Sequence, residues 1–355
     1  MKYKVFVAVF FLCCAFPLVT AWMPKVHSGD GNEVPPSVSV KTEEGKLNLE
    51  LFSDFSHYFD KQFGFREEMI TGYNQLNTFL FRESNEPKVI VGKDGFLFYT
   101  ETLSDYQGTN LLSDQELDQI VENLSKVDAY CRENGIDFVF TIAPNKNSLY
   151  PEFMPKRYRK SEEESNRERL KKRLENTSVC YVDLYKPFSE ADHVLYRKTD
   201  SHWSDEGAGL AADLILSTIE KPNRTSYFGS ETKVVHEENG DLFQMIYPAA
   251  KDPAGDVQYT KDFDFSYAAP IHSTMDMSIK TECAGKEQKL FMFRDSFGIS
   301  LHKFMANEFA ECCFSRALPY NMSLVAEYQP DVVVIEIVER NLIELAEKEP
   351  IIPTE

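Results

Sequence analysis

The sequence predicts an α/β fold in which a mostly parallel β-sheet carries helices on both faces. From residue 89 onward, short apolar runs rich in β-branched and aromatic residues alternate with stretches of helical periodicity. The runs at 136–143 and 331–338 are apolar at nearly every position, as expected for strands that helices cover on both sides. The 355 residues, 43% of them hydrophobic, allow one large domain of this class with accessory segments, or two smaller domains.

The first 24 residues differ from the rest of the chain. Lys2 and Lys4 precede an apolar run at 5–22, a pattern typical of a secretion signal peptide. The run also reaches the lower length limit for a membrane-spanning helix, so residues 1–24 fit both a cleaved signal and a retained membrane anchor. Both interpretations predict that the chain after residue 24, the body of the protein, is exported to the periplasmic or extracellular side. Residues 25–48, polar with Pro, Gly and Ser, are expected to form a linker.

The elements of the body follow in order. Residues 49–85 carry apolar side chains at helical spacing and predict a segment of two helices. A Lys-Asp-Gly turn between two apolar runs predicts a hairpin at 89–99. Residues 221–286 show no clear pattern beyond an expectation of some β-hairpin. The other predicted elements are helices at 113–133, 161–175, 205–219 and 297–309, and strands at 136–143, 179–184, 290–293 and 331–338.

Charge and cysteine usage exclude several classes of function. The net charge is −19, and no clustered cations are present to contact nucleic-acid phosphates. A polyanionic substrate is also disfavoured, unless a local basic cleft overrides the overall charge. The seven cysteines form no C-x-x-C pair and the histidines lack metal-ligand spacing, so no metal site is expected. In an exported protein the cysteines could form disulfides, or they could serve as small buried hydrophobic residues.

A first candidate site follows the predicted strand at 290–293. The sequence there is Arg-Asp-Ser-Phe-Gly, at 294–298. A serine in a tight strand-to-helix turn is exposed, and its own N–H points to the place where an oxyanion would form. Ser296 is therefore a candidate nucleophile, although Arg294 replaces the first glycine of a G-x-S-x-G elbow. The same residues also fit a simple helix N-cap.

A second candidate site lies just before the predicted helix at 205–219. Asp200 stands two residues before His202 and can orient its imidazole. A neutral imidazole oriented in this way can deprotonate a serine hydroxyl. The alternative is a capping loop in which Asp200 and Ser204 accept from helix amides, and the two interpretations are compatible.

A third polar loop, at 143–148, follows the predicted strand at 136–143. The amides of Asn145 and Asn147 could donate hydrogen bonds to an oxyanion, and Lys146 could bind a substrate group. An Asx-turn is the alternative for each asparagine. All three loops are expected beyond the carboxyl ends of strands, where open α/β sheets bind their ligands.

Taken together, these segments resemble the SGNH-hydrolase-like domain of the alginate O-acetyltransferase AlgJ/AlgX family. The resemblance covers about residues 59–340 and implies an SGNH-hydrolase-like catalytic domain at 86–345. It implies Ser296 as nucleophile, His202 as base and Asp200 as the group that orients the base. The similar segments, in the family's order, are FGFR at 63–66, VGKDGFLF at 91–98, IAPNK at 142–146, TDSHW at 199–203 and RDSF at 294–297. The candidates for substrate or oxyanion contacts are Asn145, Lys146, Asn147, Trp203 and Arg294.

The resemblance implies a function as well. It implies O-acetylation of a cell-surface or secreted polysaccharide through an acyl-enzyme at Ser296, with a membrane-bound acyltransferase as the acyl donor and no cofactor. One alternative is a carbohydrate acetylesterase with the same triad, in which water instead of a sugar attacks the acyl-enzyme. Another is a catalytically silent glycan-binding subunit of a polysaccharide assembly.

Overall fold

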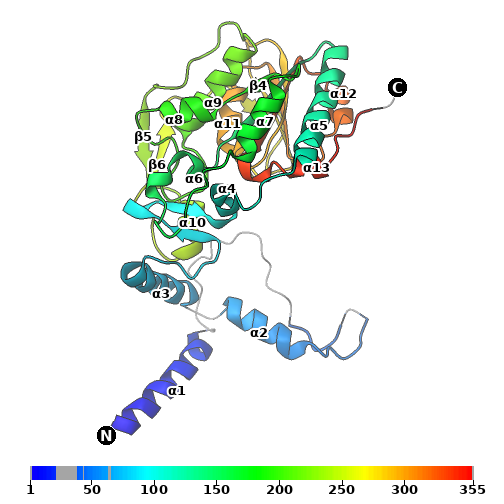
Figure 1. The fold of residues 1–355 in the computed structure, drawn as a ribbon. Helices are drawn as coiled ribbons and strands as arrows, with labels where there is room; N and C mark the ends of the chain where they lie inside the picture. Colours follow the sequence, from blue (N-terminus) through cyan, green and yellow to red (C-terminus); the bar gives the residue numbers. More distant parts are fainter. Residues whose placement is uncertain (1, 21–37, 43, 63–64, 354–355) are drawn as a thin grey trace. The chain divides into compact units, whose positions relative to one another are not determined.

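The computed structural model describes residues 2–20, 38–42, 44–62 and 65–353. The chain forms two compact units (Figure 1). One comprises Met1–Glu86 and Phe243–Lys251, and the other comprises Pro87–Leu242 and Asp252–Glu355.

The larger unit is built on a mostly parallel β-sheet, as the sequence predicts. Within the described residues this sheet has seven strands in the order β4-β3-β11-β9-β10-β8-β7. The neighbours from β4 to β10 pair in parallel, whereas β8 pairs antiparallel with both β10 and β7. The strands are β3 (Asp137–Ala143), β4 (Tyr181–Val182), β7 (Ser266–Tyr267), β8 (Ser278–Glu282), β9 (Lys289–Phe293), β10 (Glu311–Ser315) and β11 (Val332–Val338).

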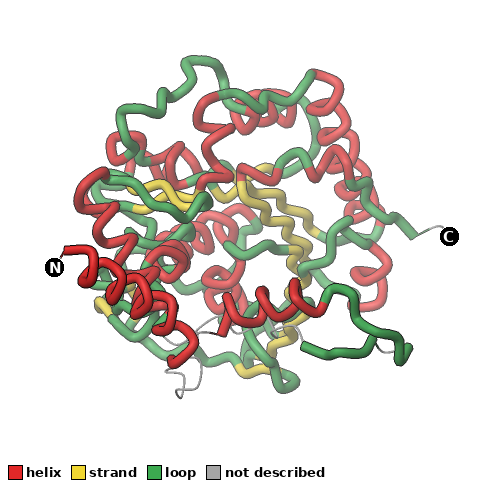
Figure 2. Tube along the Cα trace, turned by 90° about the horizontal axis from the view of Figure 1, so that it is seen from below, coloured by secondary structure: helices red, strands yellow, loops and turns green. Residues whose placement is uncertain are grey.

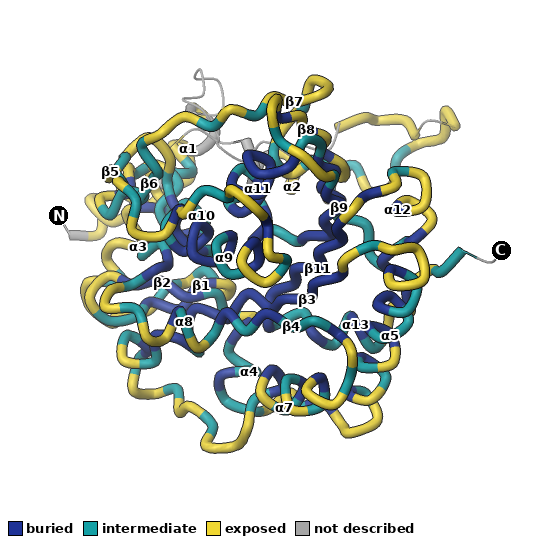
Figure 3. Tube along the Cα trace, turned by 90° about the horizontal axis from the view of Figure 1, so that it is seen from above, coloured by how far each residue is buried: buried dark blue, intermediate teal, exposed yellow. Residues whose placement is uncertain are grey.

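Helices cover both faces of this sheet (Figures 1 and 2). The central strands β3, β9 and β11 are accordingly buried along most of their length (Figure 3). Successive residues of a strand point to opposite faces, so Val334 packs in one core and Ile335 in the other. The first core contains α9 (Asp205–Thr218) and α11 (Gly298–Ala306), and the second contains α5 (Asp114–Glu133), α7 (Asn166–Leu174), α12 (Met322–Tyr328) and α13 (Glu344–Glu347).

Helix caps explain why several predicted boundaries are right and one is not. Ser113 caps α5 through a reciprocal capping box with Glu116, as the Ser-x-x-Glu spacing in the sequence predicts, and Ser204 caps α9, as predicted for the loop before that helix. The helix predicted at 161–175 begins only at Asn166, because a second capping box forms at Ser165. The strand predicted at 179–184 is reduced to β4, which lies at the edge of the sheet and pairs only with β3.

Three elements near the carboxyl end, β10, α12 and α13, were not predicted from the sequence. The helix predicted to reach residue 309 ends at Ala306, and β10 follows it. The helix α12 was not predicted either. In the unclear stretch 221–286, hairpin pairing is confirmed: β5 (Thr232–Val235) pairs with β6 (Asp256–Tyr259), and β7 pairs with β8.

A two-stranded hairpin and several short helices complete this unit. β1 (Val89–Val91) and β2 (Leu97–Tyr99) pair antiparallel around the predicted Lys-Asp-Gly turn. The short helices are α4 (Leu103–Gln107), α6 (Lys146–Leu149) and α8 (Tyr185–Glu190), with 3-10 turns at Lys93–Gly95, Thr100–Thr102, Pro151–Phe153 and Glu339–Asn341. A further short helix, α10 (Asp241–Ile246), begins in this unit and has its residues from Phe243 onward in the smaller one.

The smaller unit contains α1 (Lys2–Thr20), α2 (Leu51–Gln62) and α3 (Arg66–Phe81), so the two helices predicted within 49–85 are present. The end of the predicted signal or anchor and most of the predicted linker lie outside the described residues. Among the helices that are described, none combines the length and the apolar character needed to cross a membrane.

Helix α3 presents its apolar side chains outward. Thr71 and Asn74 are buried, and they bond to the backbone of Ala249 and Ile246 in the same unit. The exposed side chains are Met69, Tyr73, Leu76, Phe79 and Leu80. The helical spacing seen in the sequence therefore marks an exposed face of this helix, not a core face.

Six cysteines of the described residues are free thiols. They are Cys14, Cys131, Cys180, Cys283, Cys312 and Cys313. Four of the five in the body are fully buried, which agrees with a role as small hydrophobic side chains.

Candidate active site

The candidate site residues gather at one edge of the parallel sheet. Ser296 follows β9, the turn at Glu339–Asn341 follows β11, and Lys146 follows β3. These three strands are parallel neighbours, so their carboxyl ends lie at the same edge. The segment 197–203, which precedes α9, reaches the same edge and places His202 against Ser296.

Asp295 shapes the turn that presents Ser296. Its two carboxylate oxygens accept from the N–H groups of Phe297, at 2.8 Å, and Val338, at 2.7 Å. The turn thereby joins the start of α11 to the end of β11. At Gly298, a Cβ atom would lie 2.5 Å from the Cβ of Arg294, so this close turn needs glycine.

The Ser296 backbone N–H is a hydrogen-bond donor at this turn. Ser296 is only partly buried, and its N–H has no hydrogen-bond acceptor anywhere in the part of the chain that the structure describes. If Ser296 attacked a carbonyl group, this free N–H could donate to the negative oxygen of the tetrahedral intermediate. The sequence predicted this arrangement for a serine at a strand-to-helix turn.

His202 connects Ser296 to Asp200. The Nε2 atom of His202 lies 2.9 Å from Ser296 Oγ, and Nδ1 lies 2.8 Å from Asp200 Oδ1. The same Asp200 oxygen accepts the His202 backbone N–H at 2.9 Å. The structure therefore brings together the three residues that the sequence singled out, in the geometry of a nucleophile, a base and an orienting carboxylate.

The electrostatics around His202 favour an ion pair between a protonated imidazole and an ionised Asp200. Burial acts to lower the pKa of His202, but the hydrogen bond and charge of Asp200 outweigh it and raise the pKa above its usual value. Burial acts to raise the pKa of Asp200. The hydrogen bond to His202, its charge and that of Arg197 hold this pKa well below the usual range instead. Asp200 is thus ionised, and it stabilises a protonated His202.

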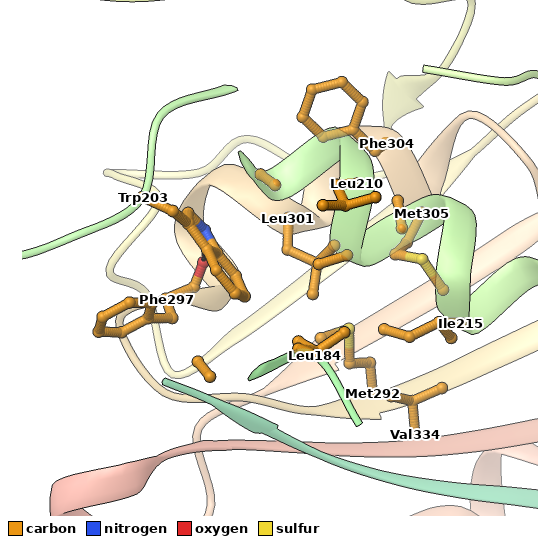
Figure 4. Packing of buried hydrophobic residues seen from close by; sticks show 14 of the residues in the cluster. Leu184, Trp203, Leu210, Ile215, Met292, Phe297, Leu301, Phe304, Met305 and Val334 are labelled. Atoms are coloured by element: carbon orange, nitrogen blue, oxygen red, sulfur yellow. Dashed lines mark hydrogen bonds between the residues drawn. The ribbon is translucent and has the colours of Figure 1, made fainter. Parts of the chain in front are cut away.

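Trp203 links the two loops that carry His202 and Ser296. Its indole is fully buried, and its Nε1–H donates to the Phe297 carbonyl at 3.1 Å. Figure 4 shows the indole beside the Phe297 ring. The centroids of the two rings are 5.1 Å apart. Trp203 therefore packs in the core and is not the substrate contact that the sequence suggested.

Lys146 also has a different role from the predicted substrate contact. Its side chain is buried, and Nζ lies within 2.7–2.9 Å of four backbone carbonyl oxygens. Three of the carbonyls belong to Arg197, Lys198 and Asp200, and the fourth to Leu97 of β2. Burial lowers the pKa of Lys146 to about 7 against the attraction of Asp200 and Asp241. Lys146 thus anchors the segment that carries His202.

The two asparagines predicted as oxyanion donors are bonded within the protein. The Asn145 side-chain nitrogen donates to Asp105 at 2.9 Å, and that of Asn147 donates to the Thr102 carbonyl at 3.1 Å. Both side chains are buried. The structure therefore corrects the prediction, since each amide joins the β3 loop to the segment around α4 (103–107).

Arg294 is likewise a structural residue in this arrangement. Its guanidinium is buried and donates to the carbonyls of Thr274, at 2.6 Å, and Asp295, at 3.3 Å. Burial lowers its pKa to about 10. Arg294 therefore holds the chain around 274 against the Ser296 turn and does not reach into solvent to bind substrate.

Two charged residues of the site were not predicted from the sequence. Asp241, at the start of α10, has Oδ2 at 3.5 Å from His202 Nδ1. The Arg340 guanidinium stacks 5.4 Å from the Tyr99 ring and 5.7 Å from the Phe297 ring. The only available signal for Arg340 was its position just after the strongly β-branched strand at 331–338.

A metal ion does not fit this site well, although one cluster has the composition for it. Within the described residues, Asp200, His202 and Asp241 have ligand atoms that all lie within 4.8 Å of one another. Every one of these atoms already has a hydrogen-bond partner, and Arg197 forms an ion pair with Asp200 at 2.7 Å. The atoms are arranged as a hydrogen-bonded acid–base network.

Comparison with protein families gives one clear match. The model for the "SGNH hydrolase-like domain, acetyltransferase AlgX" matches residues 89–274, which are 186 of the 355 residues. This range contains Asp200 and His202 and ends before Ser296.

Curated relatives agree with that family. The chain is 26% identical over 188 residues to the probable alginate O-acetylase AlgJ of Pseudomonas aeruginosa, a match that covers 52% of this chain and 46% of the relative. It is 26% identical over 209 residues to the AlgJ of Azotobacter vinelandii, covering 56% and 52%. The chain thus spans about half the length of the curated relatives it matches.

Solved structures support the fold. A DHHW family protein from Eubacterium siraeum superposes with a TM-score of 0.51 at 16% identity, covering 76% of this chain and 100% of that one. PatB1 of Bacillus cereus, solved with a sulfonyl adduct, gives 0.53 at 15% identity, covering 72% and 97%. At such identities the likeness concerns the fold alone.

Proposed function

The chain belongs to the family of the SGNH hydrolase-like domain of the acetyltransferase AlgX, and from this premise we propose that it is a serine-dependent O-acetyltransferase. Its acceptor would be a hydroxyl group of a polysaccharide outside the cytoplasm. The names of its AlgJ relatives, probable alginate O-acetylases, support a polysaccharide acceptor.

One observation carries the proposal. His202 Nε2 lies 2.9 Å from Ser296 Oγ, while Nδ1 is held at 2.8 Å by Asp200. A serine hydroxyl is too weak an acid to attack a carbonyl at neutral pH without such a base. This geometry supports Ser296 as nucleophile, His202 as general base and Asp200 as the group that fixes the imidazole.

In the first half-reaction, Ser296 Oγ attacks the carbonyl carbon of an acetyl donor, and His202 Nε2 takes the hydroxyl proton. The Ser296 N–H donates to the oxyanion that forms. The bond from the carbonyl carbon to the leaving group then breaks. His202 returns the proton to the leaving group, and an acetyl ester remains on Ser296. We propose that a membrane-bound acyltransferase supplies the acetyl group.

In the second half-reaction, a sugar hydroxyl attacks the acetyl ester, and His202 removes its proton. The bond between the acetyl carbon and Ser296 Oγ breaks, and His202 returns the proton to Ser296. The product is an O-acetyl sugar. His202 therefore acts as base and then as acid in each half.

Hydrolysis is the second candidate, because water can reach the site. The His202 side chain is 21% exposed. If water attacked the acetyl ester in place of a sugar, the same three residues would make the protein a carbohydrate acetylesterase.

The test is acylation of the full-length chain by p-nitrophenyl acetate. We expect intact-mass spectrometry to show a gain of about 42 Da, one acetyl group on the nucleophile. Ser296→Ala and His202→Ala should each lower turnover by roughly 10⁴-fold or more, because Ser296, His202 and Asp200 act together and each variant removes an essential member. Adding candidate polysaccharides then separates transfer from hydrolysis.

Ser189→Ala is the matched control. Ser189 is exposed, and among the described residues its hydroxyl bonds only to the Lys186 carbonyl of its own helix, so this variant should acylate like the parent. An adduct that persists in Ser296→Ala would disprove the assignment. A folded parent that forms no adduct would favour a catalytically silent glycan-binding subunit.

A further inference from the structure

The Nδ1 atom of His202 has more than one acceptor around it. Besides Asp200 Oδ1 at 2.8 Å, Ser201 Oγ lies at 3.2 Å and Asp241 Oδ2 at 3.5 Å. Two carboxylates therefore face one ring nitrogen, and the Ser201 hydroxyl contacts both the ring and the second carboxylate. A Ser-His-Asp triad by itself needs only the first carboxylate.

Asp241 is bonded to the His202 segment on several sides. Its Oδ1 accepts the Ser201 N–H at 2.7 Å, and its Oδ2 accepts the Ser201 hydroxyl at 2.5 Å. Its own N–H donates to Asp200 Oδ2 at 3.0 Å. Asp241 thus contacts Ser201 and Asp200, the two residues that precede His202 and lie against its ring.

The neighbouring backbone is shaped for this contact. A Cβ atom at Gly240 would lie 2.5 Å from the Thr199 carbonyl oxygen, so only glycine lets the two chain segments approach so closely. Asp252 accepts both the Gly240 N–H, at 3.2 Å, and the Thr199 hydroxyl. The close approach of 240–241 to 199–201 is therefore part of the fold.

We propose that Asp241 is a positioning residue of the acyl-transfer site, which holds Ser201 and adds a second negative charge that stabilises the protonated His202 formed when Ser296 attacks. The inference rests on the proposed function, since it assigns a role within that reaction. Asp241 acts through His202 and Asp200 and does not touch the reacting atoms.

The charged groups that face His202 determine how removing the Asp241 charge should change the pKa of the ring. Asp200 on its own segment and Asp241 on α10 favour the protonated ring, whereas Arg340, after β11, opposes it. Arg197 pairs with Asp200. The active base is neutral His202, so activity rises with pH as the ring loses its proton. Removing the Asp241 charge lowers the pKa of His202, so the acid limb of the activity profile moves to lower pH.

The experiment compares the full-length chain with Asp241→Asn, Asp241→Glu and Ser201→Ala in two measurements. The first is an NMR titration of the His202 ring, assigned by its loss in His202→Ala. The second is the pH profile of acylation by p-nitrophenyl acetate. We expect Asp241→Asn to titrate at lower pH and to lose roughly tenfold in kcat/KM, the cost of weakening one charge interaction near a developing charge.

The other variants separate charge from structure. Asp241→Glu keeps the negative charge, so its His202 ring should titrate at the same pH as in the parent. Ser201→Ala should slow acylation while leaving the pH at which His202 titrates close to that of the parent. Asp262→Asn, an exposed carboxylate away from the site, is the control for net charge. A merely structural role would slow Asp241→Asn and Asp241→Glu alike, without moving the titration.

The two measurements fail independently. If the parent forms no Ser296-dependent adduct, the proposed function is wrong, yet the titration still reports whether Asp241 acts on His202. If the parent acylates but His202 titrates at the same pH in Asp241→Asn, Asp241 does not stabilise the protonated base and the inference is wrong.

Discussion

The segment that presents Ser296 and the segment that presents His202 are anchored by opposite kinds of group. At the Ser296 turn, the Asp295 carboxylate accepts two backbone N–H groups, and buried Glu336 lies behind it. At the His202 segment, the Lys146 ammonium donates to backbone carbonyls. One anchor is an acceptor and the other is a donor.

The difference follows from which backbone groups each segment leaves without a partner. The Ser296 turn begins a helix, and the first N–H groups of a helix have no acceptor within it. The segment 197–200 precedes α9 and turns the carbonyl oxygens of Arg197, Lys198 and Asp200 toward the buried Lys146 side chain. A buried carbonyl needs a donor as much as a buried N–H needs an acceptor. The two anchors therefore have opposite charge for the same physical reason.

Replacing the donor anchor should have the largest effect on stability. Lys146→Met keeps the side-chain volume beside the Phe96 and Phe98 rings but leaves the carbonyls without their donor. We expect a loss of about 3–5 kcal/mol in the free energy of unfolding, as for breaking a buried polar network. Denaturant unfolding would measure it, and acylation activity should fall with it.

Lys198→Met is a matched control. The Lys198 ammonium lies 5.5 Å from the same Phe96 ring, but it has none of the carbonyl contacts of Lys146. Its replacement should change stability by less than about 1 kcal/mol. Equal effects of the two substitutions would contradict the role assigned to the carbonyl contacts.

Replacing the acceptor anchor should have a smaller effect. Asp295→Asn turns one acceptor oxygen into a donor that faces a backbone N–H, either of Phe297 or of Val338. We expect a loss of about 1–3 kcal/mol, measured by thermal or denaturant unfolding, because one buried N–H loses its acceptor. The Ser296 turn should shift, so acylation should fall further than stability alone explains.

Asp331, at the opposite end of β11, is the matched control for Asp295. Asp331 accepts the Lys289 N–H at 2.6 Å, but it is exposed and lies at the amino end of the strand, away from Ser296. Asp331→Asn should reduce stability slightly and leave acylation unchanged. If both variants acylate at the same rate, the turn does not depend on Asp295.

The same comparison shows what the sequence could predict. Ser296 lies in the turn that follows β9, and Asp200 stands two residues before His202, so local patterns made all three candidates, and the family resemblance implied their roles. Ser113 and Ser204 were recognised as caps because a cap is defined within one helical turn. The alternation of apolar runs and helical periodicity likewise predicted the mostly parallel sheet, since each signal lies within one element.

The anchors could not be predicted in this way. Lys146 bonds to carbonyls 49 to 54 positions away, and Ser201 and Asp241 are 40 positions apart. Nothing near Lys146 in the sequence distinguishes a buried lysine from a substrate-binding one. The strand β10 was missed for a related reason: it is five residues long, and what makes it a strand is its pairing with β9 and β8.

At low pH the smallest effect on stability is expected from replacing Glu336, and this effect grows as the pH rises. Burial and the nearby Asp295 charge raise the pKa of Glu336 well above its usual range. The stability from this neutral acid is fully present below the ordinary glutamate pKa and is lost as pH rises through the folded-state pKa. Glu336→Gln cannot ionise, so it should match the parent within about 1 kcal/mol at low pH.

At higher pH the two proteins should diverge, with the variant becoming relatively more stable by up to about 1.4 kcal/mol per pH unit. Denaturant unfolding between acid and neutral pH measures this slope. Glu282→Gln, at an exposed position, is the control. A difference in unfolding free energy between variant and parent that stays constant with pH would show that Glu336 is ionised in the folded protein. Asp200 has the opposite sign, because its contribution is present above the ordinary aspartate pKa and is lost as pH falls through its lowered folded-state pKa. Acid should therefore loosen the His202 segment first, while a neutral Glu336 still supports the Ser296 turn.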